Sequence, residues 1–167
     1  MNLTSCCSRA IDDRCPSCGQ RGRPVSPTTV SAMLVPEVSS RLPSKPGFLF
    51  CQSPECEVVY YQPGSSDLVR LNEVRVEVFQ KSTNPDRLVC YCFGHTVRAI
   101  QSEVRETGSS SILQDIKSKC SQGLDACERT NPQGSCCLGN VQRLVHQAKG
   151  GMTPSPAGGC CCRAGSE

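Results

Sequence analysis

The chain of 167 residues carries a net charge of +3, with 37% hydrophobic and 4% aromatic residues and 15 cysteines. It has room for one ordinary domain or two small ones with modest cores, and its charge lacks the basic excess typical of nucleic-acid-binding domains. We find no apolar segment typical of a signal peptide or a membrane-spanning helix, so we expect a cytoplasmic protein with no stable membrane insertion and no nucleic-acid partner.

The first predicted domain, over residues 15–80, follows a short cysteine-containing tail at residues 1–14. Cysteines of a reducing compartment serve mainly metals or redox chemistry, and an odd total fits this use better than a closed set of disulfides. Two cysteine pairs stand in this domain, C-x-x-C and C-x-x-x-x-C. They are Cys15 with Cys18, and Cys51 with Cys56. Four thiolates in two such pairs predict a closed zinc site.

Short strands are predicted around the second pair, at residues 47–51 and 57–61, in the hairpin arrangement of a zinc ribbon. A third strand is expected over residues 73–79, where charged and apolar side chains alternate. Residues 29–34 lie between prolines and predict one helical turn at most. Residues 81–87 contain turn formers without apolar periodicity, and we interpret them as a linker.

A helical domain is predicted over residues 88–150, because the apolar period changes to that of a helix after the linker. Three helices are expected, bounded by Thr96 and Gly108, by Ser110 or Ser111 and Gly123, and by Cys137 and Lys149. The predicted fold class is therefore α+β, with a small β-rich, zinc-ribbon-like subdomain followed by a helical module. Residues 151–167 are rich in Pro, Gly and Ser and predict a disordered tail.

Five cysteines of the helical domain come from two separated loops. They are Cys90, Cys92, Cys127, Cys136 and Cys137. A 2Fe-2S cluster needs two thiolates on each iron, so the pattern predicts an iron–sulfur site in which either member of the vicinal pair is the fourth ligand. His95 is an alternative iron ligand, but we expect it in the first helical turn, in contact with the loop.

Two segments, VCYCFGHT and ACERTNPQGSCCLG, resemble the 2Fe-2S module related to bacterioferritin-associated ferredoxin. Preceded by CPSCGQRGRPV and CQSPECEVVYY, they closely resemble the N-terminal zinc and 2Fe-2S domain of CopZ-type copper chaperones, over roughly residues 15–142. The resemblance implies cluster ligation by Cys90, Cys92, Cys127 and Cys137 and zinc ligation by Cys15, Cys18, Cys51 and Cys56.

Full-length proteins of that family continue into a heavy-metal-associated domain with an M-x-C-x-x-C loop, a motif that this sequence does not contain. Five tail cysteines are candidates for capturing a soft ion such as Cu(I) or Hg(II). They are Cys6, Cys7, Cys160, Cys161 and Cys162. Spare, unstructured thiols are the alternative interpretation.

The sequence favours a non-enzymatic metal-binding protein with a structural zinc and a redox-active 2Fe-2S cluster, acting in copper or other heavy-metal handling through electron transfer to the metal. Its expected partners are metal ions, copper or mercury, and a redox or metal-transport protein. A ferredoxin-like electron carrier for a reductase, with no metal delivery, is the alternative.

A third function, a zinc-ribbon protein that binds nucleic acid, would depend on Arg14, Arg21 and Arg23 alone. No G-x-S-x-G, phosphate loop or H-E-x-x-H motif supports a hydrolase.

Overall fold

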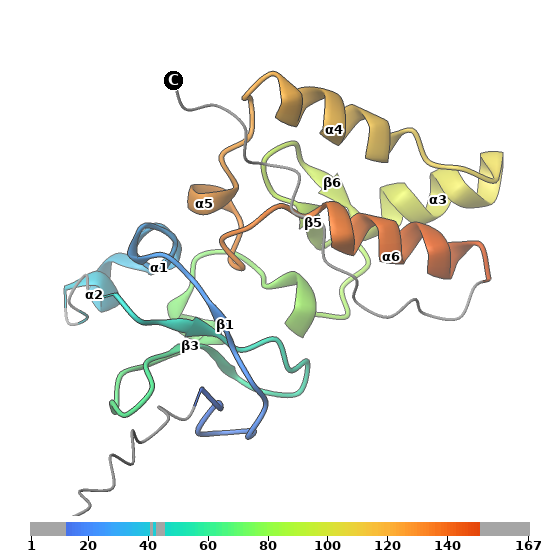
Figure 1. Cartoon of the computed structure of the whole chain (residues 1–167). Helices are drawn as coiled ribbons and strands as arrows, with labels where there is room; N and C mark the ends of the chain where they lie inside the picture. Colours follow the sequence, from blue (N-terminus) through green and yellow to red (C-terminus); the bar gives the residue numbers. More distant parts are fainter. Residues whose placement is uncertain (1–12, 41, 43–45, 151–167) are drawn as a thin grey trace, which may run out of the picture.

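The computed structural model describes residues 13–40, 42 and 46–150, and its fold is α+β, as predicted. We call residues 13–78 the sheet half and residues 79–150 the helical half. Figure 1 shows the two halves next to each other, with the short helix α5 (Cys127–Thr130) of the helical half beside α1 (Pro27–Met33) of the sheet half. Among the described residues, no helix is long and apolar enough to cross a membrane.

An antiparallel sheet of four short strands organises the sheet half. In order across the sheet, the strands are β1 (Arg23–Pro24), β2 (Leu49–Phe50), β3 (Val58–Tyr61) and β4 (Leu68–Arg70). The two strands predicted at residues 47–51 and 57–61 are confirmed as β2 and β3. A bulge in β3 lets Val59 and Tyr60 enter the main core, while Val58 and Tyr61 pack with the four cysteines of the predicted zinc site. The central strand therefore contacts both the core and the predicted zinc site.

Helix α1 is longer than the single turn predicted over residues 29–34. Its N-terminus is defined by Ser26, whose Oγ accepts a hydrogen bond from the Thr29 backbone N–H (3.1 Å), and by proline at the first helical position. A second short helix, α2 (Pro36–Ser39), follows after another proline. The prolines begin these helices, whereas the sequence interpretation treated them as limits.

The strand predicted over residues 73–79 is wrong. β4 takes the place of the third strand beside β3, and the chain then turns through the 3-10 helix η1 (Leu71–Glu73). Beyond this turn, the Arg75 N–H donates to the Met33 carbonyl at the end of α1 (2.9 Å), so the backbone here bonds to a helix end. Val74, an apolar residue of the alternating pattern, is nevertheless buried. The pattern therefore predicts burial correctly, although the backbone forms no strand here.

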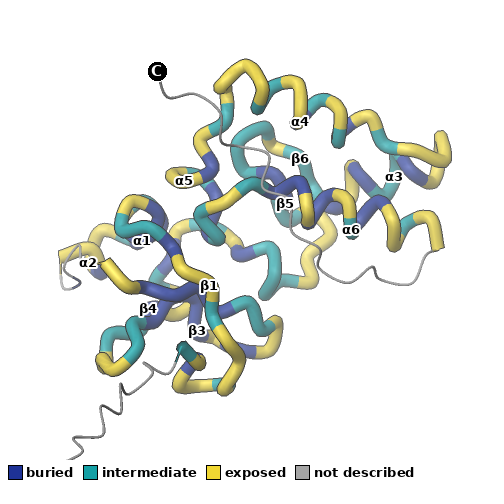
Figure 2. The backbone as a smooth tube through the Cα atoms, in the orientation of Figure 1, coloured by how far each residue is buried: buried dark blue, intermediate teal, exposed yellow. Residues whose placement is uncertain are grey.

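The helical half begins with the 3-10 helix η2 (Phe79–Lys81), which an antiparallel hairpin and four α-helices follow. The hairpin and the helices are β5 (Leu88–Cys90), β6 (His95–Thr96), α3 (Val97–Thr107), α4 (Ile112–Ser121), α5 and α6 (Leu138–Ala148). The three long helices are confirmed, with Thr96 as the N-cap of α3 and Gly108, at φ 75°, as its C-cap. The hairpin and α5 are too short to give a periodic signal. In Figure 2 buried residues follow β3 and the inner side of α6.

The two halves are joined by hydrogen bonds. The Tyr60 hydroxyl, on β3 of the sheet half, donates to the Pro132 carbonyl in the loop before α6 of the helical half (2.6 Å), and this bond is buried. Lys81, the first residue of the predicted linker, donates from Nζ to a carbonyl of the sheet half (2.7 Å to Ser53). The boundaries of the linker stay a prediction, but its beginning is bonded to the sheet half.

Gly134 provides a test of this junction. Its φ is +66°, and a Cβ at this position would lie 2.7 Å from Oγ1 of the fully buried Thr29 of α1. We expect Gly134→Ala to lower the free energy of unfolding by about 2–4 kcal/mol, because it adds left-handed strain and overpacks the junction. Denaturant unfolding of the metal-loaded protein measures the effect. Gly139→Ala, which adds the same methyl group to open space in α6, is the control and should be neutral or slightly stabilising. Equal stability of the two variants would contradict the close packing.

Candidate metal centres

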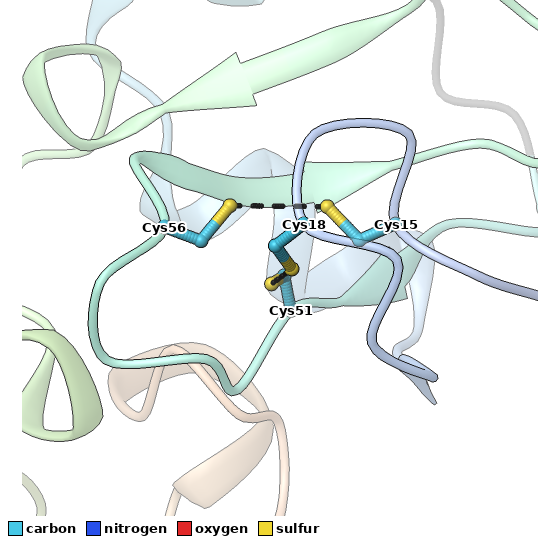
Figure 3. Close-up of side chains that lie close together, drawn as sticks. All are labelled: Cys15, Cys18, Cys51 and Cys56. Atoms are coloured by element: carbon cyan, nitrogen blue, oxygen red, sulfur yellow. Dashed lines mark hydrogen bonds between the residues drawn. The ribbon is translucent and has the colours of Figure 1, made fainter.

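The first four-cysteine set is held by two turns of the sheet half. Cys15 and Cys18 lie on a tight turn in which the Cys15 N–H donates to the Gln20 carbonyl and the Gly19 N–H to the Cys15 carbonyl, both at 2.8 Å. Gly19 has φ +70°, a conformation that glycine adopts without strain. Cys51 and Cys56 flank the loop between β2 and β3. Figure 3 shows the four side chains pointing toward one another from these two loops.

The sulfurs of this set all lie within 4.8 Å of one another. Cys15 Sγ is 3.9 Å from Cys56 Sγ, and Cys18 Sγ is 3.6 Å from Cys51 Sγ. Zn–S bonds of about 2.3 Å in a tetrahedron place the sulfurs about 3.8 Å apart, so the spacing and the all-thiol chemistry fit Zn²⁺. All except the half-buried Cys18 are buried, which is typical of a closed, structural site.

The thiols of this set differ in acidity. Burial raises the pKa of Cys51 to about 12, against the opposing effects of the Ser53 N–H and the Lys81 charge. At Cys18 burial also acts to raise the pKa, but the Gln20 N–H and the neighbouring thiols outweigh it and lower the pKa to about 7. Only part of the set is thus thiolate at neutral pH, and binding of a cation must release protons.

A second set of thiols gathers at one end of the helical half. Cys90 ends β5 and Cys92 lies in the hairpin turn, while Cys127 begins α5 and Cys137 is the N-cap of α6. Cys92 Sγ is 3.6 Å from Cys127 Sγ, and the Cys90 thiol is hydrogen-bonded to that of Cys137. The structure therefore brings together, as two pairs, the four cysteines that the family resemblance implied. In each pair, one cysteine comes from the β5–β6 hairpin and the other from the α5–α6 region.

Cys136 interacts with both Cys127 and Cys137, but its exposure differs from that of its neighbour. Cys137 is 2% exposed and belongs to the core of the helical half, whereas Cys136 is half-buried. Burial and the hydrogen bond to Cys90 distinguish Cys137 as the member of the vicinal pair that completes the two thiol pairs.

Hydrogen bonds favour a negative charge on Cys92. The neighbouring Cys127 thiol, the Thr130 hydroxyl (3.1 Å) and the Ala126 N–H (3.4 Å) together lower the pKa of Cys92 to about 6, although burial opposes them. The pKa of Cys127 is raised, because Cys136 and Cys92 act on it together with burial. In the Cys92–Cys127 pair, the negative charge accordingly lies on Cys92.

His95 lies in β6, so its prediction in the first helical turn is wrong. Its Nε2 is 3.0 Å from Asp115 Oδ2 of α4, and the same carboxylate oxygen accepts a hydrogen bond from Lys119 Nζ (2.7 Å). The sequence interpretation also missed Thr130 and Lys81, which act through contacts between distant segments and have no motif. A cation next to a cysteine loop, as at Lys81, is visible only in three dimensions.

The clustered arginines and the tail cysteines, which the sequence also singled out, lie outside the two thiol sets. Arg21 pairs with Asp13 (3.0 Å), and Arg14 donates to the Gly19 carbonyl (3.1 Å), so two of the three clustered arginines bond within the first turn. The tail thiols lie outside the described residues. They are Cys6, Cys7, Cys160, Cys161 and Cys162.

Comparison with known proteins gives one consistent result. Residues 12–75 match the CopZ family described as a zinc binding domain. The chain is 30% identical over 131 residues to the copper chaperone CopZ of Archaeoglobus fulgidus, which covers 78% of this chain and 61% of that protein. The X-ray structure of the A. fulgidus CopZ N-terminal domain aligns with a TM-score of 0.66 at 30% identity, over 78% of this chain and 96% of that chain. This chain therefore carries a CopZ-type zinc-binding domain and is a homologue of the copper chaperone CopZ.

Proposed function

We propose that the chain is a metal-binding protein of copper or other heavy-metal handling, with a structural zinc and a redox-active 2Fe-2S cluster. The observation that carries the proposal is the meeting of two thiol pairs, Cys92 with Cys127 and Cys90 with Cys137, at one end of the helical half. Zinc would be held by the four cysteines of the sheet half, Cys15, Cys18, Cys51 and Cys56.

The residues around the two thiol pairs fit a 2Fe-2S cluster, which needs two thiolates on each iron. When bound, such a cluster supplies one-electron redox chemistry, which suits the reduction of Cu(II) to the Cu(I) that thiolates bind best. The Ala126 N–H donates to Cys92 Sγ, and the Thr130 hydroxyl lies 3.1 Å from the same sulfur; both lower the pKa of Cys92 and would stabilise its negative charge. The buried side chains of Val89 and Leu138 belong to the same core as Cys90 and Cys137 and limit the access of water.

The zinc site is proposed to be structural, because zinc has no redox chemistry and four thiolates leave no open position for a substrate. We place the protein in the cytoplasm and regard it as non-enzymatic, with copper or mercury ions and a redox or metal-transport protein as its partners. The name of the A. fulgidus relative supports copper. The division into a tail (1–14), a zinc domain (15–80), a linker (81–87), a cluster domain (88–150) and a second tail (151–167) belongs to the same proposal.

The decisive experiment is to measure iron, acid-labile sulfide and zinc in protein purified without oxygen, together with its visible spectrum. We expect equal amounts of iron and sulfide, each about twice the amount of zinc, and the absorption of a 2Fe-2S cluster. Colourless protein that contains zinc alone would contradict the cluster.

A titration with Cu(I) then separates metal handling from simple electron transfer. Saturable Cu(I) binding that decreases when residues 151–167 are deleted would support ion capture by the tail, and unchanged stoichiometry would exclude the tail. A chain that holds the cluster and binds no Cu(I) would be an electron carrier for a reductase.

Lys81 offers a separate test of the zinc site. Its ammonium group donates to the carbonyls of Ser53 (2.7 Å) and Cys56 (2.8 Å) in the second cysteine loop, and its charge lowers the pKa of Cys51. We expect Lys81→Gln to lose zinc to a chelator about tenfold faster, because two charge-assisted hydrogen bonds to the loop are lost. Lys117→Gln, on the exposed side of α4, removes the same charge and should not change the rate. Equal rates for both variants would show that Lys81 does not support the loop.

A further inference from the structure

A cleft of about 640 Å³ lies at the junction of the two halves. Arg23 of β1 and the loop after Cys51 line one side, and α6 with the loop before it lines the other. Phe79 and Leu144 supply apolar surface, while Arg23, Arg87 and Arg143 supply positive charge. No aspartate or glutamate is among the described residues that line the cleft, so its electrostatic potential favours an anion.

The three arginines of the cleft have no acidic partner among the residues that the structure describes. Within the described part of the chain, none of them forms an ion pair. Arg87 stacks over the Phe79 ring (5.2 Å to the centroid) and donates from Nη1 to the Asn84 carbonyl (2.7 Å), but its Nε is buried without a hydrogen-bond partner. A buried donor without an acceptor is rare in folded proteins. The guanidinium groups of the three lining arginines offer charged donors to an anion in the cleft.

Three amide side chains of the cleft, Gln80, Gln133 and Asn140, are bonded to one another. Gln133 Nε2 donates to the carbonyls of Ser135 (3.1 Å) and Cys136 (3.0 Å), and its Oε1 accepts from the side-chain amide of Asn140 (3.0 Å). These bonds fix the loop that carries Cys136 in the wall of the cleft. The wall is thus formed before a ligand arrives, which reduces the entropy lost on binding.

We propose that this cleft binds a small thiol that carries two or more carboxylates. Its volume lies within the roughly 300–1,000 Å³ range of small-molecule sites, and a hollow of this kind suits a small ligand better than the flat surface of a partner protein. The guanidinium groups recognise the carboxylates. Cys136 brings a half-buried thiol to the wall of the same cleft, and a sulfur of the protein and a sulfur of the ligand can share one soft ion.

The assignment of Cu(I) as the ion bound by the thiol rests on the proposed function, in which the protein handles copper. The carboxylate recognition does not depend on copper. Binding of the metal-free ligand and binding of its Cu(I) complex can therefore succeed or fail separately.

The test uses reduced glutathione as the probe and the full chain as purified, followed by calorimetry or by chemical shifts of cleft residues. We expect saturable binding that Arg143→Gln weakens about tenfold, through loss of one charge-assisted contact. Arg87→Lys keeps the charge but removes the planar guanidinium group, and it should weaken binding as well. Arg105→Gln, an exposed arginine of α3 outside the cleft, is the matched control and should change nothing. No binding, or equal affinity in the Arg143 and Arg105 variants, overturns the proposal.

The role of the ligand's thiol is tested separately, by measuring how Cys136→Ser binds two ligands. S-methylglutathione retains both carboxylates and lacks the free thiol, so Cys136→Ser should leave its affinity unchanged. The same variant should weaken binding of the glutathione–Cu(I) complex at least tenfold, because one sulfur ligand of the ion is lost. Unchanged affinity for the Cu(I) complex would reduce the cleft to an anion site and overturn the thiol assignment. Binding of glutathione by a protein that takes up no Cu(I) would contradict the proposed copper function and leave the carboxylate site standing.

Discussion

Cys51→Ser is expected to unfold the sheet half of the protein. Cys51 is fully buried, continues directly from β2 and packs with Val58 and Tyr61 in the small cluster around the first cysteine set. The sheet itself is weak, because two of its strands have only two residues. A structural zinc contributes about 10–16 kcal/mol in small zinc domains, which is comparable with the whole stability of an ordinary domain. Loss of one buried ligand should therefore remove zinc and native sheet structure together.

Amide NMR spectra and zinc analysis of the Cys51→Ser protein measure this effect. Signals of residues in β2 and β3 should lose their dispersion, and zinc should fall well below one equivalent. Cys120→Ser, which changes a half-buried cysteine of α4 that belongs to neither thiol set, is the matched control and should keep zinc and sheet. A Cys51→Ser protein with full zinc and an intact sheet would contradict the structural role.

The effect should extend to the helical half. Tyr60 of β3 donates to the Pro132 carbonyl, and Pro132 lies in the loop that connects Cys127 to Cys137. If the sheet half unfolds, this loop loses its buried contact, and the two thiol pairs lose part of the framework that aligns them. The Cys51→Ser protein should accordingly lose iron faster on exposure to air than the Cys120→Ser protein.

Local signals in the sequence predicted much of this architecture. Thr96 and Gly108 bound α3 as expected, because capping depends on side-chain oxygens and on backbone freedom at single positions. The cysteine turns were equally visible, since a C-x-x-C turn followed by glycine specifies its own geometry. The predicted strand at residues 73–79 failed for the opposite reason. Its alternation records burial of Val74 correctly. The place beside β3 is taken by β4, however, and the backbone at Val74 pairs with Leu34 after α1, which is distant in sequence.

The site was predicted as a list of ligands and not as an arrangement. No sequence rule indicates that Lys81 bonds to the second cysteine loop or that the Thr130 hydroxyl contacts Cys92 Sγ. The choice between Cys136 and Cys137 could not be made from spacing, because vicinal cysteines differ in spacing by a single residue. Their different burial and partners appear only when α6 packs against the hairpin.

Cys137→Ala is expected to abolish the proposed cluster, whereas Cys136→Ala should preserve it. Cys137 is buried at the N-cap of α6 and hydrogen-bonded to Cys90, so its removal leaves one thiol pair incomplete. Cys136 lies half-buried in the wall of the cleft, outside the two pairs. The absorption of the cluster and the iron content should therefore be lost in Cys137→Ala and remain near the wild-type level in Cys136→Ala.

Alanine is the appropriate replacement, because a serine oxygen can still bind iron and would blur the comparison. The two variants remove the same atom from adjacent residues, so a general effect of cysteine loss on folding cannot produce opposite spectra. A coloured Cys137→Ala protein beside a colourless Cys136→Ala protein would reverse the assignment and move the fourth ligand into the wall of the cleft. A ligand of the cleft would then lie against the cluster itself, and the expected Cys136→Ser result with the Cu(I) complex would lose its basis. The spectra of these two variants thus decide both the ligand set and the position of the proposed thiol site relative to the redox centre.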